Sequence, residues 1–425
     1  MFKASINRLA ALSLRASALA AKFGFIVVLA VFLEPSEVGR YGLIAVTISF
    51  SLYFLGLDFY VYANREYRTS PDNDKGSVLW QMGYLFCATY ALLGPCLILL
   101  ALNGFLPWDL LHIIAALAIL EHLSTELYRF LVITGRPVLA SFGFFIRLGL
   151  WPACAALVMW LEPTTRNLHD ILLLWIFGAA LSIAIPVIVL SAKKLQVKYR
   201  AIDLVWIRSG LKITLPFLMG TLCLRGVQTF DRYIFNDLVG PDVLGAFVFF
   251  ASLASLLPAM LQAGVYSFAI PNLVSAAHEQ NWRGFFAMMR AIKREIFIST
   301  ALLSCGIFLG ARLVTGFVQN TVYMQNYDLL YFAVCANCLF AASMYFHMAL
   351  YALKRDRALT TAHVGALVSF FIFTFIISYF SKYYAVPLGV VVANLTMLCM
   401  KFVSYKVTLQ GATIPPNEIA RRDEK

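Results

Sequence analysis

Long apolar runs recur along the whole chain, and short polar clusters separate them. Each run has about 20 predominantly apolar residues, which is the length an α-helix needs to cross the hydrocarbon core of a bilayer. The separating clusters are too short to hold a soluble domain. The pattern predicts an all-α membrane protein with about twelve transmembrane helices. The expected spans are residues 12–33, 41–63, 77–102, 110–133, 138–161, 169–191, 209–234, 243–267, 295–317, 328–352, 358–380 and 386–409.

Composition supports the same class of protein. Of the 425 residues, 61% are apolar and only 13% are charged, whereas about 25% of the residues in a soluble domain are charged. This composition excludes an ordinary cytosolic protein.

The charged residues lie mainly between the apolar runs. The 34 Lys and Arg residues give a formal net charge of +12, but in the loops of a membrane protein they act as topology signals and not as a nucleic-acid site. Most of them fall on the cytoplasmic side when the N-terminus is placed inside, so we expect both termini to be cytoplasmic. Arg15 and Lys22 interrupt the first run, which therefore predicts a retained helix and not a cleaved signal peptide.

The chain has a basic segment near its middle. Residues 192–208 are rich in Lys and Arg and separate the sixth and seventh expected spans. We expect an N-terminal lobe at 1–191, this segment as a cytoplasmic linker, a C-terminal lobe at 209–409 and a cytoplasmic tail at 410–425.

The two lobes also share a short sequence echo. The run Pro35–Tyr41 before the second span resembles Pro241–Phe247 before the eighth, at a constant offset of 206 positions (241 − 35). Six helices in each half give both halves the same orientation. The repeat therefore predicts two lobes related by a pseudo-two-fold axis along the membrane normal, with a binding site between them.

Cations within the spans are candidates for function, because an ionisable side chain at bilayer depth is costly. Lys22 lies near the middle of the first span, and Arg15 lies seven residues earlier, so helical geometry places both on one face. Arg147 lies well inside the fifth span, and Arg225 lies in the outer half of the seventh. We predict that these residues line a solvated cavity. The candidate cavity cations are Arg15, Lys22, Arg147 and Arg225.

Other polar residues in the spans receive simpler interpretations. Cations nearer the span ends can extend their charge to the headgroups, and histidines without a polar neighbour are expected to be packing or interfacial residues. The cations interpreted in this way are Arg129, Lys212, Arg312 and Lys401. The histidines are His112, His347 and His363.

Acidic residues gather in the fourth span. Glu121 and His122 are adjacent, and His122, Glu126 and Arg129 follow an i, i+4, i+7 spacing that places them on one face. Asp58 is a further carboxylate, inside the second span. Two interpretations remain open: an ion pair that fixes helix packing, or a site at which H⁺ or Na⁺ is coupled to transport.

The cationic excess indicates the chemistry of the ligand. Arg and Lys are the usual protein partners of phosphate, so a substrate with a diphosphate head and a polar body fits, and a hydrophobic cation does not. The eight cysteines all fall in apolar runs, and the pair Cys335 and Cys338 has no His or second pair to complete a metal site. We expect no disulfide framework, no metal and no cofactor other than a coupling ion.

With these features in view, the sequence resembles the oligosaccharide flippases of the polysaccharide-transporter branch, in the multidrug/oligosaccharidyl-lipid/polysaccharide exporter superfamily. The likeness covers nearly the whole chain. The stretches that carry it are the first span with Arg15 and Lys22, PSEVGRYGLIAVTISF (35–50), GRPVLASFGFFIRLGLW (135–151) and TFDRYIFNDLVGPDVLGAFVFFASLASLLP (229–258).

The resemblance implies a twelve-helix, two-lobed transporter with a MATE-like fold in the bacterial inner membrane. Its expected cargo is an oligosaccharide repeat unit linked to undecaprenyl diphosphate. Alternating access would carry the cargo from the cytoplasmic to the periplasmic leaflet for O-antigen, capsule or exopolysaccharide synthesis. Expected partners are membrane lipid and the polysaccharide polymerase machinery. The resemblance also implies a role for Asp231, near the outer end of the seventh span, beside the four cavity cations.

Three alternatives compete with this interpretation. A MATE-type multidrug exporter would need a carboxylate-centred site coupled to protons or sodium, which the cationic core disfavours. A membrane glycosyltransferase or polysaccharide polymerase would need catalytic residues in a sizeable external loop, and the external loops are short, so we expect no enzyme. Peptidoglycan-precursor flippases of the superfamily usually carry two more helices, and the sequence leaves no room for them.

Overall fold

The computed structural model of the chain describes residues 2–71, 74–191, 200–318 and 320–411. Every regular element in these ranges is a helix. Within them, twelve helical segments are long and apolar enough to cross a membrane. The predicted all-α fold with about twelve transmembrane helices is therefore confirmed. Residues 192–199 of the predicted linker and residues 412–425 of the predicted tail lie outside the described residues.

The chain forms two compact units, residues 1–218 and residues 219–425. We call them the N-terminal unit and the C-terminal unit. The division falls inside the long helix α9 (Leu204–Val239), which continues through Pro216. The first turns of α9 thus belong to the N-terminal unit, beyond the boundary expected at residues 192–208.

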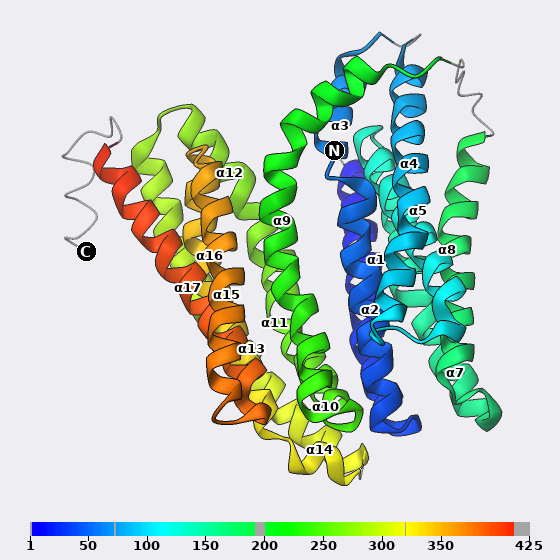
Figure 1. Cartoon of the computed structure of the whole chain (residues 1–425). Helices are drawn as coiled ribbons and strands as arrows, with labels where there is room; N and C mark the ends of the chain where they lie inside the picture. The colour runs from blue at the N-terminus through cyan, green and yellow to red at the C-terminus, as the bar shows by residue number, and fades with distance from the viewer. Residues whose placement is uncertain (1, 72–73, 192–199, 319, 412–425) are drawn as a thin grey trace. The chain divides into compact units, whose positions relative to one another are not determined.

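The N-terminal unit contains six candidate spans before α9 within the described residues. The fifth span is one continuous rod built from α6, the π-helical turn η2 and α7. Figure 1 shows these helices as a bundle. The elements are α1 (Phe2–Phe32), α2 (Pro35–Gly56), α3 (Tyr60–Thr69), α4 (Lys75–Leu102), η1 (Trp108–Leu110), α5 (Leu111–Ile133), α6 (Pro137–Phe145), η2 (Ile146–Leu150), α7 (Trp151–Leu161), η3 (Pro163–Thr165) and α8 (Leu168–Ser191).

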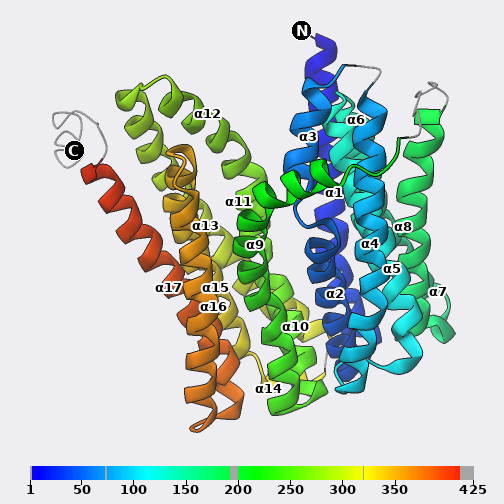
Figure 2. The same cartoon turned by 45° about the horizontal axis from the view of Figure 1, so that its top comes forward.

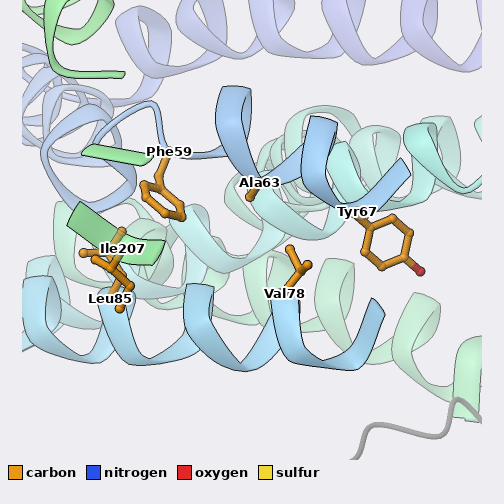
Figure 3. Close-up of a cluster of buried hydrophobic side chains, with 6 residues drawn as sticks. All are labelled: Phe59, Ala63, Tyr67, Val78, Leu85 and Ile207. Atoms are coloured by element: carbon orange, nitrogen blue, oxygen red, sulfur yellow. The ribbon is translucent and has the colours of Figure 1, made fainter. Parts of the chain in front are cut away.

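A buried apolar cluster connects the short helix α3 to α4 and to the start of α9 (Figure 3). Polar contacts reinforce this packing. Gln81 of α4 donates from Nε2 to the Ala201 carbonyl at 2.8 Å and accepts from the backbone N–H of Asp203 at 2.8 Å. The Asp203 carboxylate then accepts from the Trp206 N–H at 2.9 Å, in the manner of a helix N-cap. The cluster consists of Phe59, Ala63, Tyr67, Val78, Leu85 and Ile207.

The C-terminal unit comprises the rest of α9 and five further candidate spans within the described residues. Helix α17 packs along both α15 and α16, as Figures 1 and 2 show. The elements after α9 are α10 (Pro241–Ala254), α11 (Leu256–Leu261), η4 (Gln262–Tyr266), α12 (Ser267–His278), α13 (Trp282–Val318), α14 (Thr321–Gln325), α15 (Asp328–Ala352), α16 (Asp356–Ser378) and α17 (Lys382–Gly411).

The repeated sequence segments occupy equivalent positions in the two units. Helix α2 begins at Pro35 and helix α10 begins at Pro241, so each repeat starts a helix at its proline. Proline suits the first helical turn because its missing N–H would have no partner there. Val38 and Leu244, three residues into each helix, are both completely buried. The repeated segment thus forms the start of a helix, with one buried aliphatic residue in its first turn, in each unit.

Candidate functional site

Arg15 projects from α1 toward α5 and α6 of its own unit. Its Nε donates to Ser141 Oγ at 3.2 Å, and its Nη2 donates to the Tyr128 hydroxyl at 2.8 Å. Both acceptors are neutral, so these bonds fix the guanidinium without cancelling its charge. Lys22, on the same helix, has an exposed side chain. A shared substrate-facing surface for Arg15 and Lys22 stays a prediction.

Arg147 is a buried member of an ion pair. It lies in η2, and its Nε is 3.7 Å from Glu121 Oε2, with the two side chains 12% and 6% exposed. Its Nη1 also donates to Thr125 Oγ1, a residue on the same helix as Glu121. The sequence analysis placed Arg147 among the cavity cations and did not predict this carboxylate partner. The negative charge of Glu121 offsets the positive charge that Arg147 would present to an anion.

An aromatic wall encloses this pair. Glu121 Oε1 accepts a hydrogen bond from Trp175 Nε1 at 2.7 Å, and the Trp175 ring stacks on Trp151 with a centroid separation of 5.3 Å. Trp151 Nε1 donates to the backbone carbonyl of Arg147 at 2.7 Å. This bond gives a carbonyl of the π-helical turn a side-chain partner. Both indole rings are buried. The wall reduces water contact with the pair and so strengthens its electrostatic interaction.

The π-helical turn also sets how closely α1 approaches. A Cβ at Gly149 would lie 2.8 Å from the Ala18 Cα, so only glycine permits this spacing between the helices. π-Turns of this kind occur often at functional sites. Gly149 thus places α1, which carries Arg15 and Lys22, against the segment that carries Arg147.

The side chains of His122, Glu126 and Arg129 lie together on one face of α5, as their spacing indicates. Glu126 Oε1 pairs with Arg129 Nη1 and lies 3.9 Å from His122 Nε2. The Arg129 guanidinium stacks over the Tyr60 ring, 3.6 Å from its centroid, so packing and not snorkelling accounts for its position. His122 is 1% exposed, and its Nδ1 shares a hydrogen bond with the Tyr90 hydroxyl at 2.7 Å.

Asp58 does not lie within a transmembrane helix. Helix α2 ends at Gly56, and Leu57 and Asp58 both adopt left-handed backbone conformations with φ of 49° before α3 begins. The expected span of 41–63 was therefore wrong at both ends, because Pro35 starts the helix and this break stops it. Asp58 is nevertheless 7% exposed. A Cβ at Gly56 would lie 2.9 Å from His122 Nε2, so the break lies against the group on α5.

In the C-terminal unit, two predicted residues of α9 lie close together in sequence but differ in environment. Arg225 is exposed and donates from Nη1 to Gln228 Oε1 at 2.9 Å. Asp231 is 5% exposed and pairs with Nη1 of Arg232 at 2.9 Å. Gln228 contacts both Arg225 and Arg232, because its backbone carbonyl also accepts a hydrogen bond from Arg232 Nη1 at 2.6 Å.

The structure reveals basic residues of the C-terminal unit that the sequence analysis misassigned. Lys401 was expected to snorkel, but its side chain is 0% exposed. His347 and His363 were expected to be isolated, but their rings stack with centroids 5.9 Å apart. In sequence, Lys401 falls on a four-residue stripe with Met397 and Tyr405, both 1% exposed. That stripe could have signalled burial, although all faces of this helix are apolar enough to obscure it.

Lys212 and Arg312 are exposed on their helices, as the snorkelling interpretation requires. Among the described residues, no group of three His, Cys, Asp or Glu side chains could hold a metal ion.

Comparison with known proteins finds solved structures with a similar fold. No protein-family model matches the sequence, and no curated protein matches it. A solved inward-facing multidrug resistance MATE family transporter of the MOP superfamily is similar at a TM-score of 0.76 and 12% identity, over 92% of this chain and 94% of the other. The lipid II flippase MurJ in an inward closed conformation is similar at a TM-score of 0.72 and 12% identity, over 98% and 89% of the two chains.

At this level of identity the likeness shows the fold alone. The chain has the fold that both of these solved structures show. One is a multidrug resistance transporter and the other is a lipid II flippase, so the fold does not identify the cargo, which has to be argued from the side chains.

Proposed function

We propose that this protein is a flippase of the bacterial inner membrane. Its substrate is an oligosaccharide repeat unit linked to undecaprenyl diphosphate, which it moves from the cytoplasmic to the periplasmic leaflet by alternating access. The product supplies O-antigen, capsule or another exopolysaccharide, and the polymerase machinery is the expected partner. The fold supports a transport function over an enzymatic one, because one of the similar proteins named above is a transporter and the other is a flippase.

One observation carries the choice of cargo. Three carboxylates within the spans are already paired with arginines: Glu121 with Arg147, Glu126 with Arg129 and Asp231 with Arg232. A fourth carboxylate, Asp58, lies at the break between α2 and α3 and not within a span. A site for organic cations would need a carboxylate within a span to be available. Arg15, in contrast, is held by neutral hydroxyls and keeps its positive charge, which suits a diphosphate.

The residues proposed to contact the diphosphate are Arg15, Lys22 and Arg225. Lys22 and Arg225 have exposed side chains in the structure, which supports access by a substrate. Arg147 is proposed to position the segment around η2, because its charge is already paired. Both chain termini are proposed to be cytoplasmic.

A deletion strain tests the proposal. Loss of a flippase should leave lipid-linked repeat units accumulating on the cytoplasmic side, because their assembly does not depend on translocation. Labelled lipid intermediates, separated by chromatography and probed in everted vesicles, measure this accumulation. A strain that lacks the complete repeat unit would instead indicate an enzyme that builds it.

The MATE-type exporter remains the second candidate because a MATE family transporter shares the fold. It predicts that the deletion strain accumulates a fluorescent organic cation while its surface polymer is unchanged. Measuring dye retention beside polymer level in one strain separates the two candidates.

A further inference from the structure

A buried lysine of the C-terminal unit has no partner among the described residues. The Lys401 side chain on α17 is 0% exposed, and its Nζ makes no hydrogen bond there. An ammonium ion held out of water is costly unless it is paired or hydrogen-bonded. The Met397 and Tyr405 side chains, one turn away on either side, are also buried, so the amine has no direct path to solvent along its own helix.

Two histidines lie on the helices that pack along α17, the helix that carries this lysine. His347 comes from α15 and His363 from α16, and their rings lie nearly parallel, with 12° between planes. Both interact electrostatically with Lys401. Among the described residues, no carboxylate acts on any of these three groups, and α9 contributes the backbone carbonyl of Gly220. The cluster is therefore basic.

The hydrogen bond to α9 fixes the tautomer of His363. Its Nδ1 lies 3.2 Å from the carbonyl oxygen of Gly220. A carbonyl can only accept, so Nδ1 must donate, and the lone pair of the neutral ring is on Nε2. That Nε2 is buried without a hydrogen-bond partner, and so is Nδ1 of His347. Each of the three residues thus presents a basic nitrogen that can take up a proton.

The three nitrogens cannot all be protonated together. Like charges in a buried site of low dielectric disfavour one another, and no carboxylate among the described residues pairs with Lys401 to offset them. Groups coupled in this way titrate as a unit. The same basicity repels Na⁺, which prefers oxygen ligands, so the ion that fits this cluster is a proton.

We propose that Lys401, His347 and His363 form a proton-binding site that holds one shared proton and exchanges it during the transport cycle. This inference rests on the proposed transport function. Uptake is a simple transfer, in which an N–H bond forms on one of the three nitrogens and an O–H bond of hydronium breaks.

The hydrogen bond to Gly220 connects the proton-binding site to helix α9. Protonating His363 turns its Nδ1–H into a charge-assisted donor and strengthens its hold on α9. Gly220 lies four residues after Pro216, and a Cβ there would lie 3.2 Å from Thr360 Oγ1 of α16. Proton binding would therefore change how tightly α16 holds α9, the helix that runs through both units.

The first experiment needs no substrate. Full-length protein with ¹⁵N-labelled histidine is titrated in lipid nanodiscs, and H347Q and H363Q identify the two resonances. In K401M, both midpoints should move to higher pH by about one pH unit, because a coupled positive neighbour is gone. His169, exposed in the N-terminal unit, should not move. Superimposable titrations in wild type and K401M would overturn the site, and K401Q replaces K401M if the latter does not fold.

The second experiment tests coupling. Proteoliposomes with wild type or K401M are loaded with undecaprenyl-diphosphate-linked N-acetylglucosamine, and its translocation is measured with and without an imposed pH gradient. The gradient should accelerate wild type, and K401M should lose that acceleration. Equal acceleration of both would overturn coupling through this site. If wild type moves none of this lipid, the proposed function fails, and the NMR shift still decides whether the proton site exists.

Discussion

Two clusters of charged or basic residues, one in each unit, hold their charge in different ways. In the N-terminal unit, Arg147 and Glu121 form an ion pair behind an indole wall, and Arg129 pairs with Glu126. In the C-terminal unit, Lys401 is buried without a hydrogen-bond partner among the described residues. A paired charge stabilises the arrangement that pairs it, whereas an unpaired basic group responds to protons. The comparison assigns a stabilising role to the ion pairs of the first cluster and a proton-responsive role to the second cluster.

Lys22 provides the largest expected functional effect. Changing this lysine to Ala should abolish surface polymer and leave protein level near normal, because its side chain is exposed and leaves no core cavity when shortened. Lys22→Arg should keep partial activity, since charge remains while donor geometry changes. Both variants are expressed in the deletion strain, with polymer and protein quantified. Normal polymer in the Ala variant would remove Lys22 from the site, and loss of protein would assign it to folding.

A matched pair of variants tests the contrast between the units directly. Arg147→Met should lower the free energy of unfolding by about 3 to 5 kcal/mol, because it leaves the buried Glu121 carboxylate without its cation. Lys401→Met should be neutral or stabilising, since it removes a buried group that lacks a partner. Thermal unfolding of the purified full-length variants in one detergent measures both. Equal losses of stability would refute the contrast.

Gly149 gives a smaller effect that depends on packing alone. Gly149→Ala should cost about 1 to 3 kcal/mol, because the new Cβ would lie 2.8 Å from the Ala18 Cα. Gly24→Ala on α1 is the control. No atom lies within 4 Å of its Cβ position, so it should gain about 1 kcal/mol from helix propensity. If both alanines had the same effect, the close approach of α1 to η2 would be wrong.

The smallest effect is expected where the chain enters α9. Asp74 and Arg200 are 2.5 Å apart, but their side chains are 48% and 56% exposed, so Asp74→Ala should cost less than about 1 kcal/mol. Gln81→Leu is the comparison in the same place. It leaves the Ala201 carbonyl and the Asp203 N–H without their partner and should cost about 2 kcal/mol. Chemical unfolding that ranks the two in the opposite order would contradict this account.

The sequence predicted features that depend on short-range periodicity. The twelve spans follow from runs of apolar residues, and the pairing of Glu126 with His122 and Arg129 follows from spacing on one helix. The break at Leu57 and Asp58 could not be predicted, because Leu seldom adopts a left-handed backbone and both residues lie in a run apolar enough to read as one continuous span. The break lies against the group on α5.

Contacts between helices were not accessible from the sequence. Glu121 and Arg147 are on separate helices, and nothing in their local sequence indicates that they pair. Lys401, His347 and His363 form one cluster only because α15 and α16 both pack along α17. A hydropathy pattern shows that a residue lies in a span, but a span whose every face is apolar does not show which face meets protein.

Direct translocation in a purified system tests the central claim. Full-length protein is reconstituted with undecaprenyl-diphosphate-linked N-acetylglucosamine, and an enzyme confined to one side reports which leaflet holds the sugar. The account predicts that wild-type protein makes lipid from the opposite leaflet accessible, and that Lys22→Ala does not. Accessibility equal to that of protein-free liposomes, with wild-type protein correctly folded, would contradict it.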